Sequence, residues 1–541
     1  MKGAQYVGLD RGDGWWRRAV IYELAVVSFQ DSDGDGKGDL AGLLQRTDYL
    51  TWLGVDAVWL TPIYPSPMGD FGYDIADFRA VDPTFGTLAD FDRVLHALHN
   101  AGIRLILDFV PNHTSSEHPW FIESSSSRTG DKADWYLWAD GAANGGPPNN
   151  WLSRFGGTAW EWSEARRQFY CHTFLTQQPD LNWRNPRLQE ALADVMRFWL
   201  DRGVDGFRVD ASAVLIKDDL LRDNPPNPDA GKETPPPQRF TPVFTDDRPE
   251  TMGCIEMLRE VLDEYDGRVL CGEVQGKTDR IGHFYGSDKP RLHLPLNFAL
   301  LDSQWDALSL QATIDAYFNA LPKGAWPDWV IGGHDKQRVA SRIGPAQARV
   351  LAMLLLTVRG TPFLYMGDEL GKQRSAVPRK AVKDPFERLV PGFGLGRDPE
   401  RTPMRWDDSD AGGFSTGKPW LPMPDDRSCN VERQQRDERS LLQLYRRLIA
   451  LRREHRCLAE GDYQPLRARN DVLHYRRGHG GARIAIALNI ANEPRQWQWA
   501  SGIRLVSTHL DRPVERVAGP VQLRANEGIV VLEEASSPQA E

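Results

Sequence analysis

Eight short runs of apolar residues, rich in Val, Ile, Leu, Trp and Phe, recur between residues 19 and 369. Such runs are typical of strands buried on both faces, as in a parallel sheet. Amphipathic stretches with a closing glycine lie between most of them, for example at 87–102 and 191–203. Eight strands that alternate with helices predict a (β/α)8 TIM barrel, an α/β fold. A doubly wound open sheet is the alternative, but no GxGxxG motif follows the first run. The runs are 19–26, 55–62, 104–110, 204–211, 268–274, 293–300, 328–335 and 361–369.

The spacing of these runs predicts the domain organisation. About 94 residues separate the third run from the fourth, far more than an ordinary crossover needs. We therefore expect a subdomain inserted after strand 3, over residues 112–185, with the barrel formed by residues 1–111 and 186–456. Alternating strands with turn residues between them then predict an all-β sandwich domain over residues 457–541. A second long connection, the proline-rich excursion at 222–250, contains eight prolines. It should therefore be stiff and could form part of the wall of the active site.

Composition narrows the class of protein. The 541 residues are 41% hydrophobic and 26% charged, as in a soluble globular chain. The net charge of −10 argues against nucleic acid as a partner, because the chain would repel a phosphate backbone. No run has the roughly 18 apolar residues of a membrane helix, and the N-terminus lacks the apolar stretch of a signal peptide. Five scattered cysteines without a CxxC pair indicate reduced structural thiols. The interpretation is a cytoplasmic protein without a membrane partner.

Carboxylates close three of the predicted strands. Asp210 ends the fourth run, Glu273 the fifth and Asp335 the seventh. The reactive groups of such barrels lie at the carboxyl ends of the strands, so these side chains should converge. Two carboxyl groups that flank a bond are what glycoside hydrolysis needs, one as nucleophile and one as proton donor. Structural ion pairs with Arg208 and Arg338 are the alternative interpretation.

The motifs around these acids resemble those of a known family. DFVPNH, GFRVDA, CGEV and GGHD occur in this order, together with QPDLN at 178–182 and GTPFLYMGDE at 360–369. This set is similar to the ordered motifs of the α-amylase family, glycoside hydrolase family 13. QPDLN and RTPMRW, at 401–406, point to its oligo-1,6-glucosidase and α-glucosidase branch. The resemblance runs from about residue 15 into the C-terminal domain.

The resemblance implies three catalytic roles. Asp210 would be the nucleophile, Glu273 the general acid/base and Asp335 the transition-state stabiliser. Arg208 lies two positions before Asp210, on the same face of the strand, and can keep the nucleophile ionised. Glu273 must start protonated, so we expect it in a less compensated environment than Asp210.

Further residues are expected to bind the sugar. The segment GDFGYD resembles the part of the family that supplies a stacking tyrosine, Tyr73, and an aspartate, Asp70, to the glucose site. His113 and His334 lie beside the carboxylates and are expected to act as neutral donors to sugar hydroxyls. The plainer interpretation is that Tyr73 and the histidines belong to the core and that Asp70 holds a turn.

In this branch an arginine of the RTPM motif joins the aspartate of the glucose site and closes it beyond the non-reducing end. We assign this role to Arg401, with Arg397 as the competitor. A closed end implies exo action, in which one glucose is released or transferred at a time.

An acidic, glycine-rich loop follows the first predicted strand. Carboxylates so closely spaced repel one another unless a hard cation such as Ca²⁺ neutralises them. The loop is not an EF-hand, because its twelfth position is Gly42 rather than Glu. It resembles the calcium loop of this branch, and a solvated acidic turn is the alternative. The implied ligands of a structural Ca²⁺ are the side chains of Asp31, Asp33, Asp35 and Asp39 and the carbonyl of Lys37.

The chain departs from the family pattern at three places. Gly333 stands where the family usually has Asn, which removes a side-chain hydrogen bond. Ala211 follows the nucleophile where enzymes that favour α-1,6 bonds tend to carry Val. The first strand reads IYELAVVSF rather than the usual IYQIYPRSF.

The prediction is a retaining exo-α-glucosidase that prefers short α-1,4-glucosides such as maltose and also transfers glucose to hydroxyl acceptors. Its partners would be the small α-glucoside and either water or the acceptor. Sucrose isomerase, trehalose synthase and sucrose glucosyltransferase share the motifs and remain alternatives. A catalytically silent, amylase-like binding protein is an alternative of another class. That class loses the acids, whereas Asp210, Glu273 and Asp335 are all present.

Overall fold

The computed structural model describes residues 14–274, 278–499 and 501–534. Eight parallel strands form the barrel, in the order β10-β11-β1-β2-β3-β7-β8-β9. The two outer strands of this order also meet, since Val330 N donates to Asn297 O at 3.1 Å. The predicted fold class is confirmed. The strands are β1 (Ile21–Leu24), β2 (Ala57–Leu60), β3 (Arg104–Phe109), β7 (Gly206–Val209), β8 (Val269–Glu273), β9 (Leu294–Leu296), β10 (Asp328–Val330) and β11 (Thr361–Tyr365).

The strands are shorter than the apolar runs that predicted them. β7 ends at Val209 and β10 at Val330, whereas the runs extend to residues 211 and 335. The residues beyond each strand leave the ladder and form loops at its carboxyl end. The register places Asp108 of β3 opposite Arg208 of β7, and Arg208 opposite Cys271 of β8. A charged pair is thus built into neighbouring strands of a sheet whose residues are otherwise mostly apolar.

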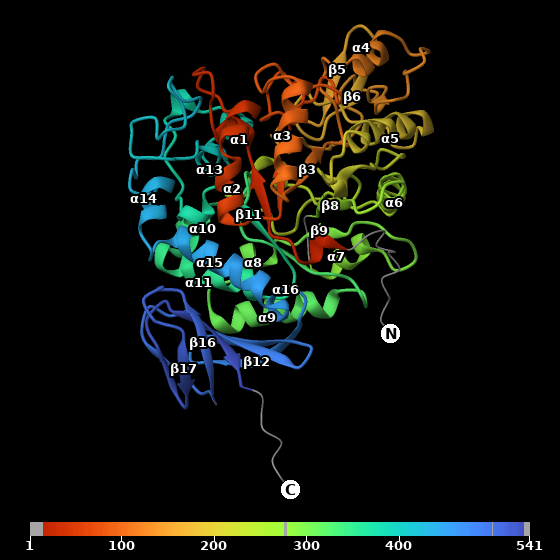
Figure 1. Cartoon of the computed structure of the whole chain (residues 1–541). Helices are drawn as coiled ribbons and strands as arrows, with labels where there is room; N and C mark the ends of the chain where they lie inside the picture. Colours follow the sequence, from red (N-terminus) through yellow and green to blue (C-terminus); the bar gives the residue numbers. More distant parts are fainter. Residues whose placement is uncertain (1–13, 275–277, 500, 535–541) are drawn as a thin grey trace.

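Helices pack around the strands (Figure 1). α3 begins with a capping box between Thr87 and Asp90, as the predicted segment suggests. α5 begins five residues before the predicted segment, because Asn185 caps it and Pro186 occupies its first turn. These helices are α1 (Leu40–Gln45), α2 (Thr47–Leu53), α3 (Leu88–Asn100), α5 (Pro186–Asp201), α6 (Thr251–Leu262), α7 (Thr278–Tyr285), α8 (Ala299–Asp302), α9 (Ala307–Ala320), α10 (Val339–Ile343) and α11 (Pro345–Thr357).

The long connection after β3 forms a small structure of its own. It contains α4 (Pro119–Ser126) and a three-stranded antiparallel sheet of β4 (Trp138–Ala139), β6 (Gln168–Cys171) and β5 (Trp160–Ser163). Trp151 and Trp160 stack in its core with ring centroids 5.6 Å apart. Figure 1 shows this part at the end of the barrel opposite the C-terminal strands.

The C-terminal strands pack on helices of the barrel. α11, α15 (Leu441–Glu454) and α16 (Arg456–Ala459) lie between the two parts (Figure 1). A six-stranded antiparallel sheet has the order β12-β13-β14-β19-β16-β17, and the two-stranded sheet β15-β18 shares an apolar cluster with it. The strands are β12 (Asp462–Arg469), β13 (Val472–His479), β14 (Ala482–Asn489), β15 (Arg495–Trp497), β16 (Ser501–Ser507), β17 (Glu515–Ala518), β18 (Val521–Leu523) and β19 (Gly528–Glu533).

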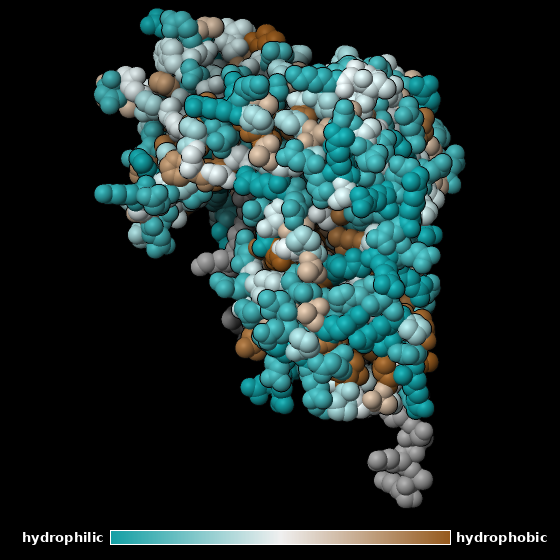
Figure 2. Space-filling model, turned by 90° about the vertical axis from the view of Figure 1, so that its left-hand side faces the viewer, coloured by the Kyte–Doolittle hydropathy of each residue, from teal (hydrophilic) through white to brown (hydrophobic). Residues whose placement is uncertain are grey.

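The face of the molecule in Figure 2 is mainly hydrophilic. On the face shown in Figure 2, hydrophobic residues appear as small, separate patches. Within the described ranges, no helix has the length and apolar character that crossing a membrane requires.

A buried ion pair fastens the inserted part to the barrel. Lys217 Nζ lies 2.8 Å from Asp180 Oδ2, and the two side chains are 2% and 0% exposed. Lys217 also donates to Asn112 Oδ1 at 2.7 Å. Burial alone would raise the pKa of Asp180, but Lys217 and the bonds from Thr173 bring it below its usual value. Lys217, in the loop after β7, therefore binds both ends of the insertion. One end is Asn112, shortly after β3, and the other is Asp180 of QPDLN.

We expect Lys217→Met to lower the free energy of unfolding by about 3–5 kcal/mol, because it leaves Asp180 buried without its cation. The measurement is urea denaturation followed by tryptophan fluorescence. Lys217→Met/Asp180→Asn should recover part of the loss, since the uncompensated charge is then gone. Arg197→Met, which breaks exposed pairs with Glu264 and Glu190, is the control and should cost about 1 kcal/mol or less. Equal midpoints for Lys217→Met and the wild type would contradict this role.

Candidate active site

A cavity of about 260 Å³ opens among the loops that follow the barrel strands. Asp210, Glu273 and Asp335 all line it, so the three acids converge as predicted. The inserted part and the proline-rich excursion both contribute to its wall, the latter through residues such as Pro237 and Gln238. Among the described residues, those that line it are Asp70, Tyr73, His113, Arg154, Phe155, Phe174, Asp210, Ala211, Ala213, Val214, Pro237, Gln238, Asp246, Asp247, Glu273, Asp335, Phe386, Leu395 and Arg397.

One guanidinium group contacts three carboxylates at the floor of this cavity. Arg208 Nη1 donates to Asp210 Oδ1 at 2.6 Å and to Asp108 Oδ1 at 2.8 Å. Its Nη2 donates to Glu273 Oε2 at 2.5 Å. Glu273 and Asp210 thus share one cation, so the contacts do not show the less compensated environment that we expected for Glu273. Arg208 lies on β7 between β3 and β8, and its fork reaches the acids of both neighbouring strands.

The two central acids cannot both ionise at low cost. Burial raises the pKa of Asp210, Arg208 opposes this effect, and the nearby charges of Glu273 and Asp108 raise the pKa further. The net pKa lies well above the usual value for aspartate. We infer that Asp210 and Glu273 hold one proton between them near neutral pH, as coupled carboxyl pairs do.

Asp335 has the opposite electrostatic environment. Arg401 Nη2 lies 2.5 Å from its Oδ1, Arg397 Nη1 lies 3.2 Å away, and His334 Nε2 lies 3.3 Å away. Burial alone would raise the pKa of Asp335, but Arg397, His334 and Arg401 together hold it well below its usual range. This carboxylate is therefore ionised at all physiological pH values.

The arginine that contacts Asp70 is Arg397, the competitor, and not Arg401 as we assigned. Arg397 Nη2 lies 2.8 Å from Asp70 Oδ1. Arg401 is buried outside the cavity lining and stacks on Phe71 at 4.1 Å. The two arginines cap and end the short helix α13 (Asp398–Arg401), and their i, i+4 spacing places both beside Asp335.

Sequence reasoning missed the residue that orients Arg397. Asp384 accepts from Arg397 Nη2 at 2.7 Å and Nε at 3.0 Å, and it also caps α12 (Pro385–Leu389). The only local signal was the Asp-Pro pair that starts this helix. Asp108 was visible in DFVPNH and Gln178 in QPDLN, but neither was assigned a role.

Tyr73 lines the cavity and joins it to Asp108. Its hydroxyl donates to Asp108 Oδ2 at 2.8 Å and lies 2.9 Å from His334 Nε2. Burial raises the pKa of Tyr73 well above its usual value, so it is a neutral donor. His334 Nδ1 lies 2.6 Å from Glu23 Oε1. Both ring nitrogens of His334 thus have protein partners, and His334 is not among the described lining residues, so our prediction of direct sugar binding is not supported.

His113 does line the cavity. Its Nε2 lies 3.2 Å from Tyr73 O and 3.1 Å from Gln178 Nε2, while Gln178 Nε2 also reaches Asp70 Oδ2 at 3.2 Å. Burial lowers the pKa of His113 to about 4, so the ring is neutral near pH 7, as expected. His113 and Gln178 thus hold Asp70 and Tyr73 from the side of the inserted part.

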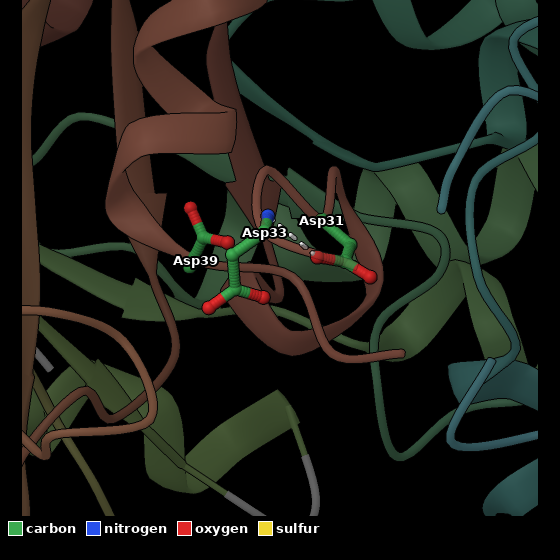
Figure 3. A group of neighbouring side chains, drawn as sticks. All are labelled: Asp31, Asp33 and Asp39. Atoms are coloured by element: carbon green, nitrogen blue, oxygen red, sulfur yellow. Dashed lines mark hydrogen bonds between the residues drawn. The ribbon is translucent and has the colours of Figure 1, made fainter. Parts of the chain in front are cut away.

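Three of the four acids in the glycine-rich loop come together. Figure 3 shows the side chains of Asp31, Asp33 and Asp39 grouped beside one another, and their ligand atoms all lie within 4.8 Å. Asp31 also accepts from Gly36 N at 2.8 Å. Asp35 lies outside this group, and its Oδ1 accepts from Lys37 N at 2.7 Å. The carboxylate oxygens suit a hard cation, although the structure brings together a smaller set than we predicted.

The sequence from residue 24 to 461 matches the pattern of the family described as alpha amylase, catalytic domain. The chain belongs to the α-amylase family. A Rhizobium meliloti protein named probable alpha-glucosidase is 41% identical over 499 residues, which cover 88% of this chain and 90% of that protein. An oligo-1,6-glucosidase from Parageobacillus thermoglucosidasius is 37% identical over 518 residues, covering 88% of this chain and 91% of the relative.

Two solved structures of this family extend the comparison. The α-glucosyl transfer enzyme XgtA superposes with a TM-score of 0.90 and 40% identity, covering 96% of this chain and 99% of that one. The trehalulose synthase MutB has a TM-score of 0.88 and 33% identity, covering 96% and 100%. The chain is a glycoside hydrolase of the α-amylase family, with the three acids in place. This finding disfavours a catalytically silent binding protein.

Proposed function

We propose that the protein is a retaining, exo-acting α-glucosidase that prefers short α-1,4-glucosides and passes glucose to water or to another hydroxyl acceptor. The observation that carries the proposal is the bridging of Asp210 and Glu273 by Arg208 in a cavity whose end is closed by the pair of Asp70 and Arg397. The names of the relatives, which include α-glucosidases and maltases, support the same class of substrate.

The geometry favours retention of configuration. In retaining glycosidases the two carboxyl groups lie about 5–5.5 Å apart, whereas inverting enzymes need about 6.5–9.5 Å to admit a water. Asp210 and Glu273 both bind the same guanidinium, at 2.6 Å and 2.5 Å, which supports the shorter separation. Asp210 would then attack the anomeric carbon and form a covalent glucosyl intermediate.

A proton shared by Asp210 and Glu273 fits the roles of a nucleophile and a proton donor. For reaction it must lie on Glu273, which gives it to the glycosidic oxygen as the bond to the leaving sugar breaks. Asp210 is then ionised and forms the new bond from the opposite side. In the second step Glu273 takes a proton from water or an acceptor hydroxyl, which displaces Asp210. Asp335 stays ionised throughout and can accept hydrogen bonds from the sugar while positive charge develops on its ring.

The closed end supports exo action. Arg397 binds Asp70 and Asp335 and is itself held by Asp384. Phe155 and Phe386 lie against its guanidinium, with ring centroids 5.4 Å and 5.0 Å from Cζ. A sugar chain cannot extend through this wall, so the glucose that reacts would be the terminal one.

Transfer to a second sugar is the other candidate activity. It is favoured by the similarity to XgtA, an α-glucosyl transfer enzyme, and to MutB, a trehalulose synthase. The acceptor would enter beside Gln238 and Asp247, which the proline-rich excursion contributes to the cavity wall. The ratio of transfer to hydrolysis then depends on how well this side holds a sugar in place of water.

We also propose that the acidic loop binds one structural Ca²⁺ through Asp31, Asp33 and Asp39. None of these residues lines the cavity, so the ion would stabilise the loop and take no part in the reaction. As part of the same proposal, the protein is cytoplasmic, which its five unpaired cysteines support.

Glu273→Gln should lower kcat on maltose by about 10²- to 10⁴-fold, because the amide keeps the shape of the side chain but cannot supply the proton. Binding of maltose, measured by calorimetry, should survive. Glu264→Gln on the surface is the control and should leave kcat unchanged. Near-normal turnover by Glu273→Gln would contradict the assignment, and inversion of the first product's anomer by NMR would contradict retention.

Ala211 tests the bond preference. It lines the cavity directly after the nucleophile, and its backbone is left-handed, with φ 47° and ψ 35°. We expect the wild type to prefer maltose over isomaltose. Ala211→Val should shift the ratio of kcat/KM toward isomaltose by about 10- to 200-fold, the effect of one or two methyl groups in a shaped pocket.

The same substitution should lower the melting temperature, because a β-branched residue is strained at positive φ. Ala211→Gly is the matched control, since glycine relaxes the backbone without adding methyl groups. It should keep the preference for maltose. A ratio that is unchanged in Ala211→Val would show that another part of the wall sets the linkage.

Removal of Ca²⁺ by chelation should lower the melting temperature, because an ion that binds only the folded state stabilises it by about 2.7 kcal/mol at 100 times its Kd. Asp33→Asn should abolish the response to Ca²⁺. Asp35→Asn is the matched control, because Asp35 lies outside the group of three, and it should leave the response intact. Unchanged melting and no bound metal by elemental analysis would overturn the site.

A further inference from the structure

Glu23, on β1, accepts hydrogen bonds from His334. Glu23 is 2% exposed, and its Oε1 lies 3.0 Å from the backbone N of His334 and 2.6 Å from the ring Nδ1. A carboxylate only accepts, so Nδ1 carries a proton and the ring cannot rotate without losing this bond. Glu23 is not among the described cavity-lining residues, so it acts on the substrate only through others.

The ring that Glu23 orients contacts two residues of the cavity. His334 Nε2 lies 2.9 Å from the hydroxyl of Tyr73 and 3.3 Å from Asp335 Oδ1. The ring also stacks on Tyr73, with centroids 5.4 Å apart and planes at 17°, and on Phe71 at 6.0 Å and 19°. A rotation of His334 would therefore disturb both the stabilising carboxylate and the aromatic wall.

The contacts continue from Tyr73 to the nucleophile. Tyr73 donates to Asp108 at 2.8 Å, Arg208 donates to Asp108 at 2.8 Å, and the same nitrogen of Arg208 donates to Asp210 at 2.6 Å. Glu23 thus stands at the start of a series of close polar contacts that ends at Asp210, with a branch at His334 to Asp335.

Gly333 provides the space that the Glu23 carboxylate occupies. A Cβ at Gly333 would lie 3.2 Å from Glu23 Oε2 and 3.8 Å from Oε1. Gly333 is not among the glycines with positive φ, so the backbone does not require glycine there. A side chain at this position would push the carboxylate away from His334. The space beside Gly333 is thus filled by the Glu23 carboxylate.

We propose that Glu23 is a positioning residue for the reaction. It fixes the ring of His334 and thereby the positions of Asp335 and Tyr73. Gly333 leaves the space that the Glu23 carboxylate occupies. The proposal rests on the α-glucosidase activity proposed above. The two positions at which the chain departs from the family pattern, in the first strand and before His334, are thus one structural unit.

The first test is Glu23→Gln, which keeps the length of the side chain but removes its charge and so weakens its hold on the ring of His334. With p-nitrophenyl α-glucoside, kcat should fall about 10- to 100-fold, the effect seen when a carboxylate that orients a histidine is lost. KM should stay within about twofold, because only the transition state is affected. Glu369→Gln is the matched control.

The control alters another buried carboxylate, which accepts from the hydroxyls of Tyr22 and Tyr49 at 2.8 Å and 2.6 Å. Neither Glu369 nor these tyrosines are among the described residues that line the cavity. Its kcat should stay within about twofold even if its melting temperature falls. A kcat for Glu23→Gln equal to that of the wild type, or a loss that Glu369→Gln reproduces, would overturn the proposal.

The second test measures the coupling between the two positions. Gly333→Ala should lower kcat in the wild type but should have little further effect in Glu23→Ala, because the methyl group then has no carboxylate to displace. Equal losses in both backgrounds would show that the positions act independently, and the role of Gly333 would be wrong.

A third measurement needs no activity. The proton on His334 Nδ1 should give a downfield imidazole N–H signal in the NMR spectrum of the wild type, identified by its absence in His334→Asn and shifted or lost in Glu23→Gln. An identical signal in Glu23→Gln would overturn the contact. If the wild type turns over no α-glucoside while this signal behaves as expected, the proposed function fails and the positioning contact stands.

Discussion

The site depends on one buried cation. Arg208 is 3% exposed and contacts Asp108, Asp210 and Glu273, which come from three neighbouring strands. Unpaired carboxylates at this depth would each cost several kcal/mol, so the acids of a glycosidase can meet in a barrel only if a cation is built in with them. Because one guanidinium group contacts three carboxyl groups, its single positive charge cannot balance three negative charges. The nearby charges of Glu273 and Asp108 accordingly help to raise the pKa of Asp210.

A second group of cations surrounds Asp335 and shifts its pKa in the opposite direction to that of Asp210. Arg397 and Arg401 both contact Asp335 and help to hold its pKa well below the usual range, whereas the pKa of Asp210 is raised well above it. Asp210 and Asp335, two aspartates of equal intrinsic strength, thus differ in pKa because of their neighbours. Glu23 and His334 lie between the two groups and connect them. The barrel contributes little chemistry of its own, but it fixes the strand order that brings these charges together.

The sequence predicted the barrel and the three acids because both depend on local signals. Each strand is a run of apolar residues, and each acid stands at the end of a run. Contacts between distant segments could not be predicted in this way. The motif could not decide between Arg397 and Arg401, because one turn of α13 places both near Asp335, and Asp384 carries no periodic signal at all. The partners of His334 and the exclusion of Asp35 from the acidic group likewise depend on loop geometry that no spacing rule encodes.

The order of these charges along the chain has a consequence for synthesis. Asp70 emerges from the ribosome more than three hundred residues before Arg397, and Asp335 emerges before both of its arginines. Until residue 401 has appeared, the half-made barrel carries carboxylates whose cations do not yet exist. Such a nascent chain cannot bury its own floor and must keep it hydrated, which delays closure and exposes the apolar strand edges. The ion pairs of Asp70 and Asp335 can therefore form only after residues 397–401 have been synthesised.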